Sequence, residues 1–249
     1  LGRPVAEDAL ILGISGRYEF KNKGIDVFID AMGQLNRNNG LGKEVLAFIL
    51  VPAGHAGANK ELLHNLELPY QAVTSTDLYL THYLNDSAND PVMNRIRAQK
   101  LRNSEEDKVK IFFVPSYLNG DDGVFNMPYY DLLVGMDLTA FPSYYEPWGY
   151  TPLESLAFKV PTITTTLAGF GLWVKEHYNM NHPGIEVIHR EDGDASNVAT
   201  AIAEWVKNYT QVGETEMQKD RDNAKDVSRI ALWDNLINYY KQAYQGAFW

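Results

Sequence analysis

The sequence predicts an α/β protein built on a doubly wound, Rossmann-like parallel sheet. Short apolar runs alternate along the chain with segments of helical periodicity. Several of these runs are apolar at nearly every position, which is typical of strands that are buried on both faces of a parallel sheet. The repeated order of strand and helix favours parallel pairing, because consecutive parallel strands need a crossover that a helix supplies.

The predicted elements follow one another regularly. The first unit is a strand at Ala9–Ser15 and a helix at Ile25–Leu35, in which apolar residues recur every three or four positions. Further apolar runs predict strands at Val45–Val51, Val109–Val114, Asp137–Pro142, Thr162–Thr166 and Ile185–His189. Helices are expected near Tyr129–Gly135, Pro152–Lys159, Leu172–His177 and Ser196–Asn208.

Residues 1–227 are therefore predicted to form one Rossmann-like domain. Within it, residues 59–107 are more polar and less periodic, so we expect an insertion that carries one or two helices. The pattern of residues 228–249 predicts one long amphipathic helix. Its apolar stripe recurs at spacings of three and four positions: Ile230, Trp233, Ile237, Tyr240 and Tyr244. The stripe fits either ordinary core packing or docking onto a part of the protein outside this chain.

Composition narrows the function classes. The chain has 249 residues, with 22 Lys+Arg against 32 Asp+Glu and a formal net charge of -10 at pH 7. This charge opposes binding to nucleic acid or to an anionic membrane, and no apolar run approaches the ~20 residues of a membrane span. The chain has no Cys, which fits a reducing, cytoplasmic compartment and removes thiolate chemistry. Because it starts without Met, we expect a piece of a longer protein.

The loop after the first strand carries two cations. Ligands of open α/β sheets bind at the carboxyl ends of the strands, where this loop, Ser15–Gly24, is expected to lie. It has no G-x-G-x-x-G and no Walker sequence, so it does not match a dinucleotide or ATP site. Arg17 and Lys23 stand just before a helix N-terminus, a position that suits a pyrophosphate. The alternative is that both are ordinary exposed charges.

The loop after the strand at Asp137–Pro142 carries two acids. Glu146 and Glu154 stand eight positions apart around a turn of glycine and aromatic residues. Thr151 as N-cap with Glu154 at the third helical position would form a capping box, which is the structural alternative for Glu154. Glu146 has no such explanation and is expected to contact a ligand.

Other candidate sites are weaker. The loop Thr166–Gly171 follows a strand and contains small residues that let a substrate approach the backbone, whereas Asn119–Gly123 reads as a solvated turn. Tyr129 and Tyr130 could stack on a base or pack against the protein. The six His residues form no H-E-x-x-H, and there is no G-x-S-x-G, so neither a metal centre nor a serine nucleophile is predicted.

Three stretches, Ser15–Phe28, Asp107–Pro115 and Phe141–Glu154, strongly resemble the glycogen synthase family of the animal and fungal type. The resemblance implies a retaining GT-B glycosyltransferase, with two Rossmann-like domains that face a cleft. It implies that this chain is the C-terminal half, which binds UDP-glucose, and that the partners are an α-1,4-glucan acceptor and an N-terminal domain onto which residues 228–249 pack. No cofactor, metal, nucleic acid or membrane is implied.

The resemblance also implies roles for individual residues. Arg17 and Lys23 match the pair that holds the donor diphosphate, and Glu146 matches an acid near the glucosyl group, which gives a catalytic set of three. Glu154 matches a contact to the ribose hydroxyls, and Tyr129 matches an aromatic that stacks on uracil. The implied donor-binding set is completed by the glycines and the turn residues: Gly16, Trp148, Gly149, Tyr150 and Thr151.

The sequence departs from the family in one respect that concerns regulation. Eukaryotic members carry a dense arginine run that senses glucose 6-phosphate, whereas residues 214–229 hold only dispersed basic residues among acids: Lys219, Arg221, Lys225 and Arg229. This departure puts control by this sugar phosphate in doubt and leaves it open. Transfer from ADP-glucose, another acceptor, and a non-catalytic nucleotide-sugar binding module are the alternative functions.

Overall fold

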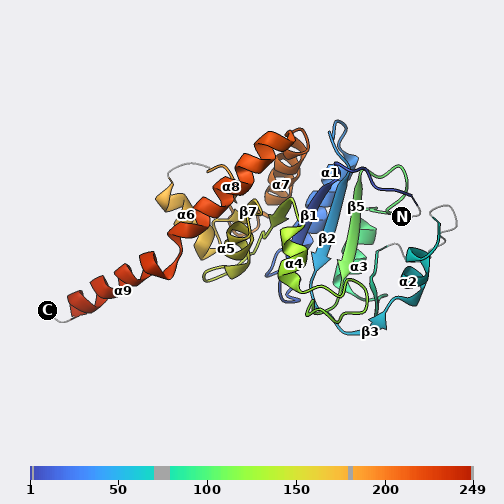
Figure 1. Cartoon of the computed structure of the whole chain (residues 1–249), viewed down its shortest axis with the longest axis horizontal. Coiled ribbons are helices and arrows are strands. Elements are labelled where there is room, and N and C mark those ends of the chain that lie inside the picture. The colour runs from blue at the N-terminus through green and yellow to red at the C-terminus, as the bar shows by residue number, and fades with distance from the viewer. Residues whose placement is uncertain (2, 70–78, 179–181, 248–249) are drawn as a thin grey trace.

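A six-stranded parallel sheet forms the centre of the molecule (Figure 1). The computed structural model describes residues 1, 3–69, 79–178 and 182–247. The strands run in the order β5-β2-β1-β6-β7-β8. Their bounds are β1 Leu10–Ser15, β2 Val45–Leu50, β5 Val109–Val114, β6 Leu138–Ala140, β7 Thr162–Thr165 and β8 Ile185–Ile188. The predicted parallel α/β sheet is therefore confirmed, with strand limits within a few residues of those expected.

Helices cover both faces of the sheet. On one face lie α1 Ile25–Arg37, α3 Pro91–Ala98 and α7 Ala195–Tyr209, and their apolar side chains share one core with β1, β2 and β5. On the other face α4 Tyr129–Val134 packs against the alternate residues of the same strands. A further cluster joins α5 Tyr150–Ala157, α6 Gly169–His177, β8 and α8 Glu214–Ile230. This double winding leaves the carboxyl ends of the strands to the connecting loops.

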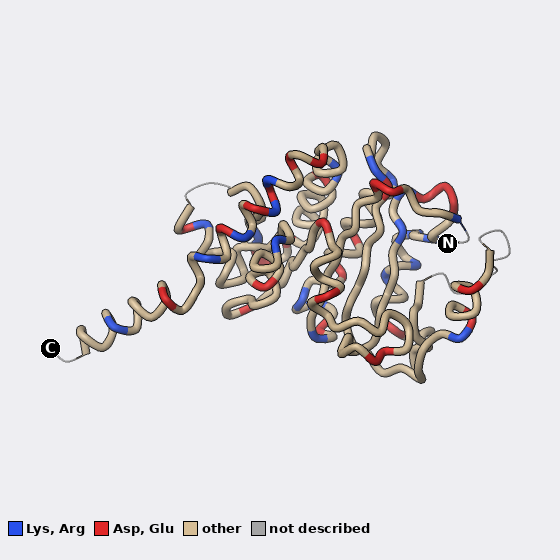
Figure 2. Tube along the Cα trace, in the orientation of Figure 1, with Lys and Arg blue, Asp and Glu red and all other residues tan. Residues whose placement is uncertain are grey.

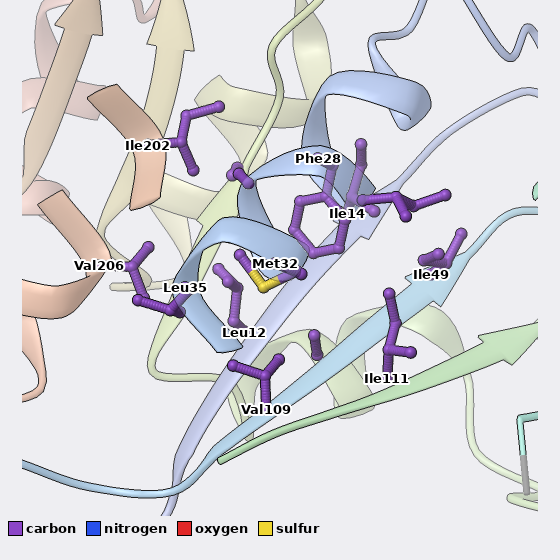
Figure 3. Close-up of a cluster of buried hydrophobic side chains, with 14 of the residues drawn as sticks. Leu12, Ile14, Phe28, Met32, Leu35, Ile49, Val109, Ile111, Ile202 and Val206 are labelled. Atoms are coloured by element: carbon purple, nitrogen blue, oxygen red, sulfur yellow. The ribbon is translucent and has the colours of Figure 1, made fainter. Parts of the chain in front are cut away.

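The largest core lies where α1 contacts α7 and the sheet. Figure 3 shows Phe28 and Leu35 of α1 among side chains from the strands and from α7, with Ile202 and Val206 on the latter. Phe28 and Leu35 have no exposed surface. Burying a side chain of this size contributes roughly 1.5–3 kcal/mol, so this interface anchors the helix that follows the first cation-bearing loop.

Residues 59–107 contain two described helices, α2 Lys60–Leu66 and α3. A short antiparallel pair that the sequence pattern did not predict, β3 His55–Ala58 and β4 His82–Leu84, lies beside them. The ion pair of Arg95 with Asp30 fastens α3 to α1. Helix α3 of the insertion therefore packs on the same face of the sheet as α1.

The C-terminal segment differs from the single helix that was predicted. Ile230 ends α8, and a second helix, α9 Trp233–Ala247, begins after a short break. The spacing of three and four continues across the break, which is why periodicity alone did not reveal it. No described residue of α9 is buried, so core packing is the wrong interpretation of its aromatic stripe. Figure 1 shows α9 extending away from the rest of the chain.

The part of the chain that the structure describes contains no helix with the length and apolarity needed to cross a membrane.

Candidate functional site

Three loops meet at the carboxyl edge of the sheet, and backbone hydrogen bonds hold them together. The amide of Tyr144 donates to the carbonyl of Asn22 at 2.8 Å, which joins the loop after β6 to the loop after β1. The amide of Gly169 donates to the carbonyl of Glu146 at 3.0 Å, which joins the loop after β6 to the loop after β7. Segments 15–24, 141–149 and 166–169 therefore form one continuous surface.

Lys23 and Glu146 form an ion pair at the centre of this surface. The Nζ atom of Lys23 donates a hydrogen bond to Oε2 of Glu146. Their side chains are only 14% and 20% exposed, respectively, so water screens the two charges less than it screens a surface pair. The structure thus brings together one cation and one acid of the predicted catalytic set.

Gly24 permits the tight approach of these two loops. Its φ of 68° lies in the left-handed region, and a Cβ at this position would overlap the carbonyl oxygen of Pro142. Only glycine combines that backbone conformation with that contact. The position of Lys23 opposite Glu146 therefore depends on its neighbour in the sequence.

Gly149 occupies the N-cap of α5, with a φ of 109°. The capping box, the structural alternative for Glu154, is wrong, because the helix already begins at Tyr150 and Thr151 lies inside it. The positive φ of Gly149 turns the chain into the helix two residues earlier than a Thr151 cap would. Glu154 is therefore free of a capping role, and its Oε1 accepts a hydrogen bond from the Tyr130 hydroxyl at 3.1 Å.

The structure does not bring Arg17 into contact with Lys23 or Glu146. Its side chain is 76% exposed, and its Nη1 lies 2.9 Å from Oε1 of Glu19. Gly16, directly before it, has a φ of 146°, a positive value that favours glycine. Of the four charged residues that the sequence singles out, Lys23 and Glu146 contact each other, whereas Arg17 and Glu154 have separate partners.

Tyr129 connects α4 with the end of β1. Its hydroxyl lies 2.7 Å from Oγ of Ser15. Burial raises the pKa of Tyr129 to about 12, because the protein disfavours the charged phenolate. Tyr130 faces outward and stacks on Phe158, with ring centres 4.9 Å apart.

The turn residues divide into packed and exposed side chains. Trp148 contacts Phe170 and Trp173 of α6, with ring centres 5.6 Å from each. Tyr150 is 70% exposed, and Thr151 is half-buried beside it. Trp148 thus packs the turn against α6, while Tyr150 faces solvent at the start of α5.

Two residues near the site were missed by the sequence analysis. Tyr117 follows β5 and is 76% exposed, and its neighbour Leu118 accepts a hydrogen bond from the Tyr129 amide at 2.9 Å. Its position just after a buried strand is the sequence feature that could have identified it as a candidate site residue. Arg190 follows β8 and is buried beneath the loop of Glu146, which no motif indicated.

Among the described residues, no group of three or more His, Asp or Glu could hold a metal ion. Positive charge at the site comes from side chains and from the N-terminus of α5, which no side chain caps within the described part of the chain. Such a helix end attracts anions through its unpaired N–H groups.

The family profile described as glycogen synthase matches residues 5–78 and 71–248. The chain belongs to the glycogen synthase family. It is 28% identical to glycogen [starch] synthase isoform 2 of Saccharomyces cerevisiae over 96% of this chain. It is 29% identical to glycogen [starch] synthase of Neurospora crassa and 27% identical to the liver enzyme of Rattus norvegicus, over 96% and 95% of this chain respectively.

This member of the glycogen synthase family spans 41% to 43% of the length of those relatives. Among solved structures, WaaG, a glycosyltransferase involved in lipopolysaccharide biosynthesis, aligns with a TM-score of 0.48 and 16% identity. That alignment covers 90% of this chain and 44% of WaaG.

Three of the four basic residues of α8 form ion pairs with acids in the structure. Figure 2 shows blue and red segments interspersed along this helix. Arg221 lies 2.7 Å from Asp137, and Lys219 lies 2.9 Å from Glu216. Arg229 is likewise paired, with Asp226, at 3.0 Å. Three of the four basic residues that the sequence analysis named in residues 214–229 are thus held by acids.

Proposed function

We propose that this chain is the donor-binding, C-terminal half of a retaining GT-B glycosyltransferase. The enzyme transfers glucose from UDP-glucose to the non-reducing end of an α-1,4-glucan in the cytoplasm. The observation that carries the proposal is the contact of Lys23 with Glu146 where the loops after β1 and β6 meet. Family membership supports the reaction class, and the length of the relatives supports a missing N-terminal half.

The cations of the loop after β1 have a direct role in this reaction. Bond breakage at C1 of glucose moves an electron pair onto an oxygen of the departing diphosphate. Lys23, Arg17 and the uncapped N-terminus of α5 stabilise that charge, and Tyr150 and Thr151 provide the backbone N–H groups at the helix end. A well-placed donor of this type contributes about 3 kcal/mol to transition-state stabilisation in other enzymes. No metal is needed in this scheme.

The acceptor enters on the face that the diphosphate leaves. The oxygen of the acceptor 4-hydroxyl bonds to C1 of glucose while the bond between C1 and the diphosphate breaks. The departing phosphate oxygen takes the proton of that hydroxyl. Configuration is therefore retained without a covalent enzyme intermediate. Glu146, next to Lys23, faces the glucosyl group and stabilises the positive charge that develops on the sugar.

The remaining predicted contacts bind the nucleoside. Tyr129 stacks on uracil, Glu154 binds the ribose hydroxyls, and Gly16 leaves room for the phosphates. The hydrogen bond of Tyr130 to Glu154 supports this assignment, because it holds the carboxylate near α4, where the base is placed. The exposed ring of Tyr117 is a second candidate surface for the base, because the neighbouring residue Leu118 contacts the Tyr129 backbone.

The N-terminal domain completes the enzyme. The exposed aromatic residues of α9, which include Trp233 and Tyr240, dock onto that domain. The acceptor and part of the catalytic machinery lie there, so the chain by itself binds UDP weakly and transfers no measurable glucose.

Two assays test this function. Calorimetry of the chain with UDP, combined with a glucosyl-transfer assay, is expected to give weak binding and negligible transfer. In the complete enzyme, Arg17→Ala and Lys23→Ala are expected to reduce turnover at least tenfold with folding intact, since each removes a donor to the leaving group. Unchanged turnover would reject these roles. Competition between UDP-glucose and ADP-glucose identifies the donor, and binding without transfer in the complete protein would indicate a non-catalytic module.

A further inference from the structure

Arg190 is a buried cation directly beneath the loop that carries Glu146. It follows β8 and is only 4% exposed. Its Nη1 donates a hydrogen bond to the carbonyl of Pro142, two residues after the end of β6. Its guanidinium lies 5.3 Å from the centre of the Tyr144 ring, a cation–π distance.

The surroundings of Arg190 are unusual for a residue that only fills a core. Its Nε has no hydrogen-bond partner among the described residues, and the same holds for one buried carboxylate oxygen each of Asp26 and Asp194. Burial lowers the pKa of the Arg190 guanidinium, while the charges of Asp26 and Asp194 oppose that shift. Buried charges of this kind are often less stabilising than apolar residues of the same volume. Folding stability alone therefore does not account for an arginine here.

Arg190 contacts segments that lead to both members of the ion pair. The Pro142 carbonyl that it binds is also the atom against which Gly24 packs, one residue after Lys23. Tyr144, the ring over its guanidinium, donates its amide to Asn22, one residue before Lys23.

The backbone of Arg190 adds a third connection. Its amide donates to Oγ1 of Thr166 at 3.0 Å, at the start of the loop after β7. That loop pairs with Glu146, since the Gly169 amide donates to the Glu146 carbonyl at 3.0 Å. Arg190 thus contacts two of the three loops directly and reaches the third, residues 15–24, through Pro142 and Tyr144.

We propose that Arg190 is a positioning residue that acts through Pro142 and Tyr144 to hold Lys23 and Glu146 against each other. It touches neither the ion pair nor, in the proposed function, the donor. Its hold on the loops is a property of this chain alone, whereas its effect on donor binding rests on the proposed function.

The experiment compares Arg190→Met and Arg190→Lys with a control, Arg221→Met. Arg221 is also largely buried and paired, with a side chain 20% exposed, but it joins α8 to Asp137 at the amino end of β6, away from the loops. Two quantities are measured in the chain: hydrogen exchange of the Tyr144 and Gly169 amides, and the dissociation constant for UDP. Assays are run well below the unfolding temperature of each variant, so that loss of global stability does not enter.

In Arg190→Met we expect the two amides to exchange at least tenfold faster than in the unmodified chain and UDP to bind at least fivefold more weakly. Arg221→Met should leave both quantities within twofold. Arg190→Lys, which keeps the charge and one donor for Pro142, should recover most of both losses. If Arg190→Met does not fold, Arg190→Gln is measured in its place and should show the same losses, because its shorter, uncharged side chain does not carry a donor to the Pro142 carbonyl.

Wild-type exchange rates in Arg190→Met would overturn the proposal, as would faster exchange in that variant with unchanged UDP affinity. Equal effects of Arg221→Met would overturn it too, since they would indicate a general loss of structure. Failure of the unmodified chain to bind UDP would reject the proposed function instead, and the exchange rates would still decide whether Arg190 holds the loops.

Discussion

The ammonium group of Lys23 and the carboxylate of Glu146 form an ion pair between loops that are 123 residues apart in the sequence. Both loops leave the sheet from adjacent strands, since β1 pairs with β6. Gly24 on one side and the Pro142 carbonyl on the other bring the chains close enough for the contact. The parallel sheet therefore determines which distant residues meet, and the glycine determines how closely.

Loss of one partner of this pair should destabilise the fold. Lys23→Met leaves the carboxylate of Glu146 in a site where its side chain is 20% exposed, so we expect the free energy of unfolding to fall by about 1–3 kcal/mol. A double-mutant cycle with Glu146→Gln, measured by urea unfolding, gives the coupling energy, which is expected to be about 1 kcal/mol or more.

The exposed pair of Lys219 with Glu216 is the control for that cycle, with side chains 64% and 59% exposed. Its coupling should be about 0.5 kcal/mol or less, because water screens it. Equal coupling in the two cycles would show that the pair at the site has no special protection from solvent.

Gly24→Ala should disrupt the site more than a glycine substitution elsewhere. The added Cβ meets the Pro142 carbonyl in addition to the strain of a positive φ, so we expect a loss of more than about 3 kcal/mol in unfolding free energy. Gly57→Ala is the control, because Gly57 has a φ of 104° and no atom within 4 Å of the added Cβ. It should lose only about 1–2 kcal/mol, and the opposite ranking would contradict the described packing.

Tyr129 makes stability depend on pH in the alkaline range. Its pKa rises from the ordinary value of 10.0 to about 12 in the folded chain, mainly because the side chain is buried. Between these pH values the unfolded chain releases the proton and the folded chain keeps it, so unfolding becomes easier as pH rises, by about 1.4 kcal/mol per pH unit. Urea unfolding of Tyr129→Phe should lack this contribution to the slope. Identical slopes for the variant and the unmodified chain would show that Tyr129 titrates normally.

Helix α9 should add little to the stability of this chain, because none of its described residues is buried. Removal of residues 233–249 is expected to shift the unfolding temperature by about 2 °C or less. Val227→Ala, in the buried face of α8, is the contrast and should cost about 1–3 kcal/mol. A large loss on removing α9 would mean that it packs on this domain rather than onto a partner domain.

Much of the fold could be predicted because burial determines the sequence pattern directly. The strand at Val45–Leu50 is apolar throughout since helices cover both faces of the sheet, and α1 shows its buried face as a regular apolar stripe. The break between Ile230 and Trp233 left no such trace, because the apolar spacing is the same on both sides of it. The N-cap at Gly149 was missed because the fold sets its positive φ. A glycine in the sequence does not reveal this, since glycine is compatible with many other backbone conformations.

The site was predictable only in part for a similar reason. Lys23 and Glu146 could be paired in advance, since each follows a strand and the carboxyl ends of parallel strands share one edge. The outward position of Arg17 could not, because a flexible exposed side chain is placed by local partners such as Glu19. Arg190 carried no signal, since its importance arises from contacts with Pro142 and Tyr144 that only the folded chain creates.

Titration of the chain with UDP, followed by calorimetry, tests the central claim most directly. Lys23→Ala is expected to weaken binding at least tenfold, equivalent to about 1.4 kcal/mol, because the ammonium group is the buried cation nearest Glu146. Lys219→Ala, which removes an equal charge from α8, should bind UDP as the unmodified chain does. Equal affinities for Lys23→Ala and Lys219→Ala would contradict the account, since the diphosphate would then bind away from the meeting point of the loops.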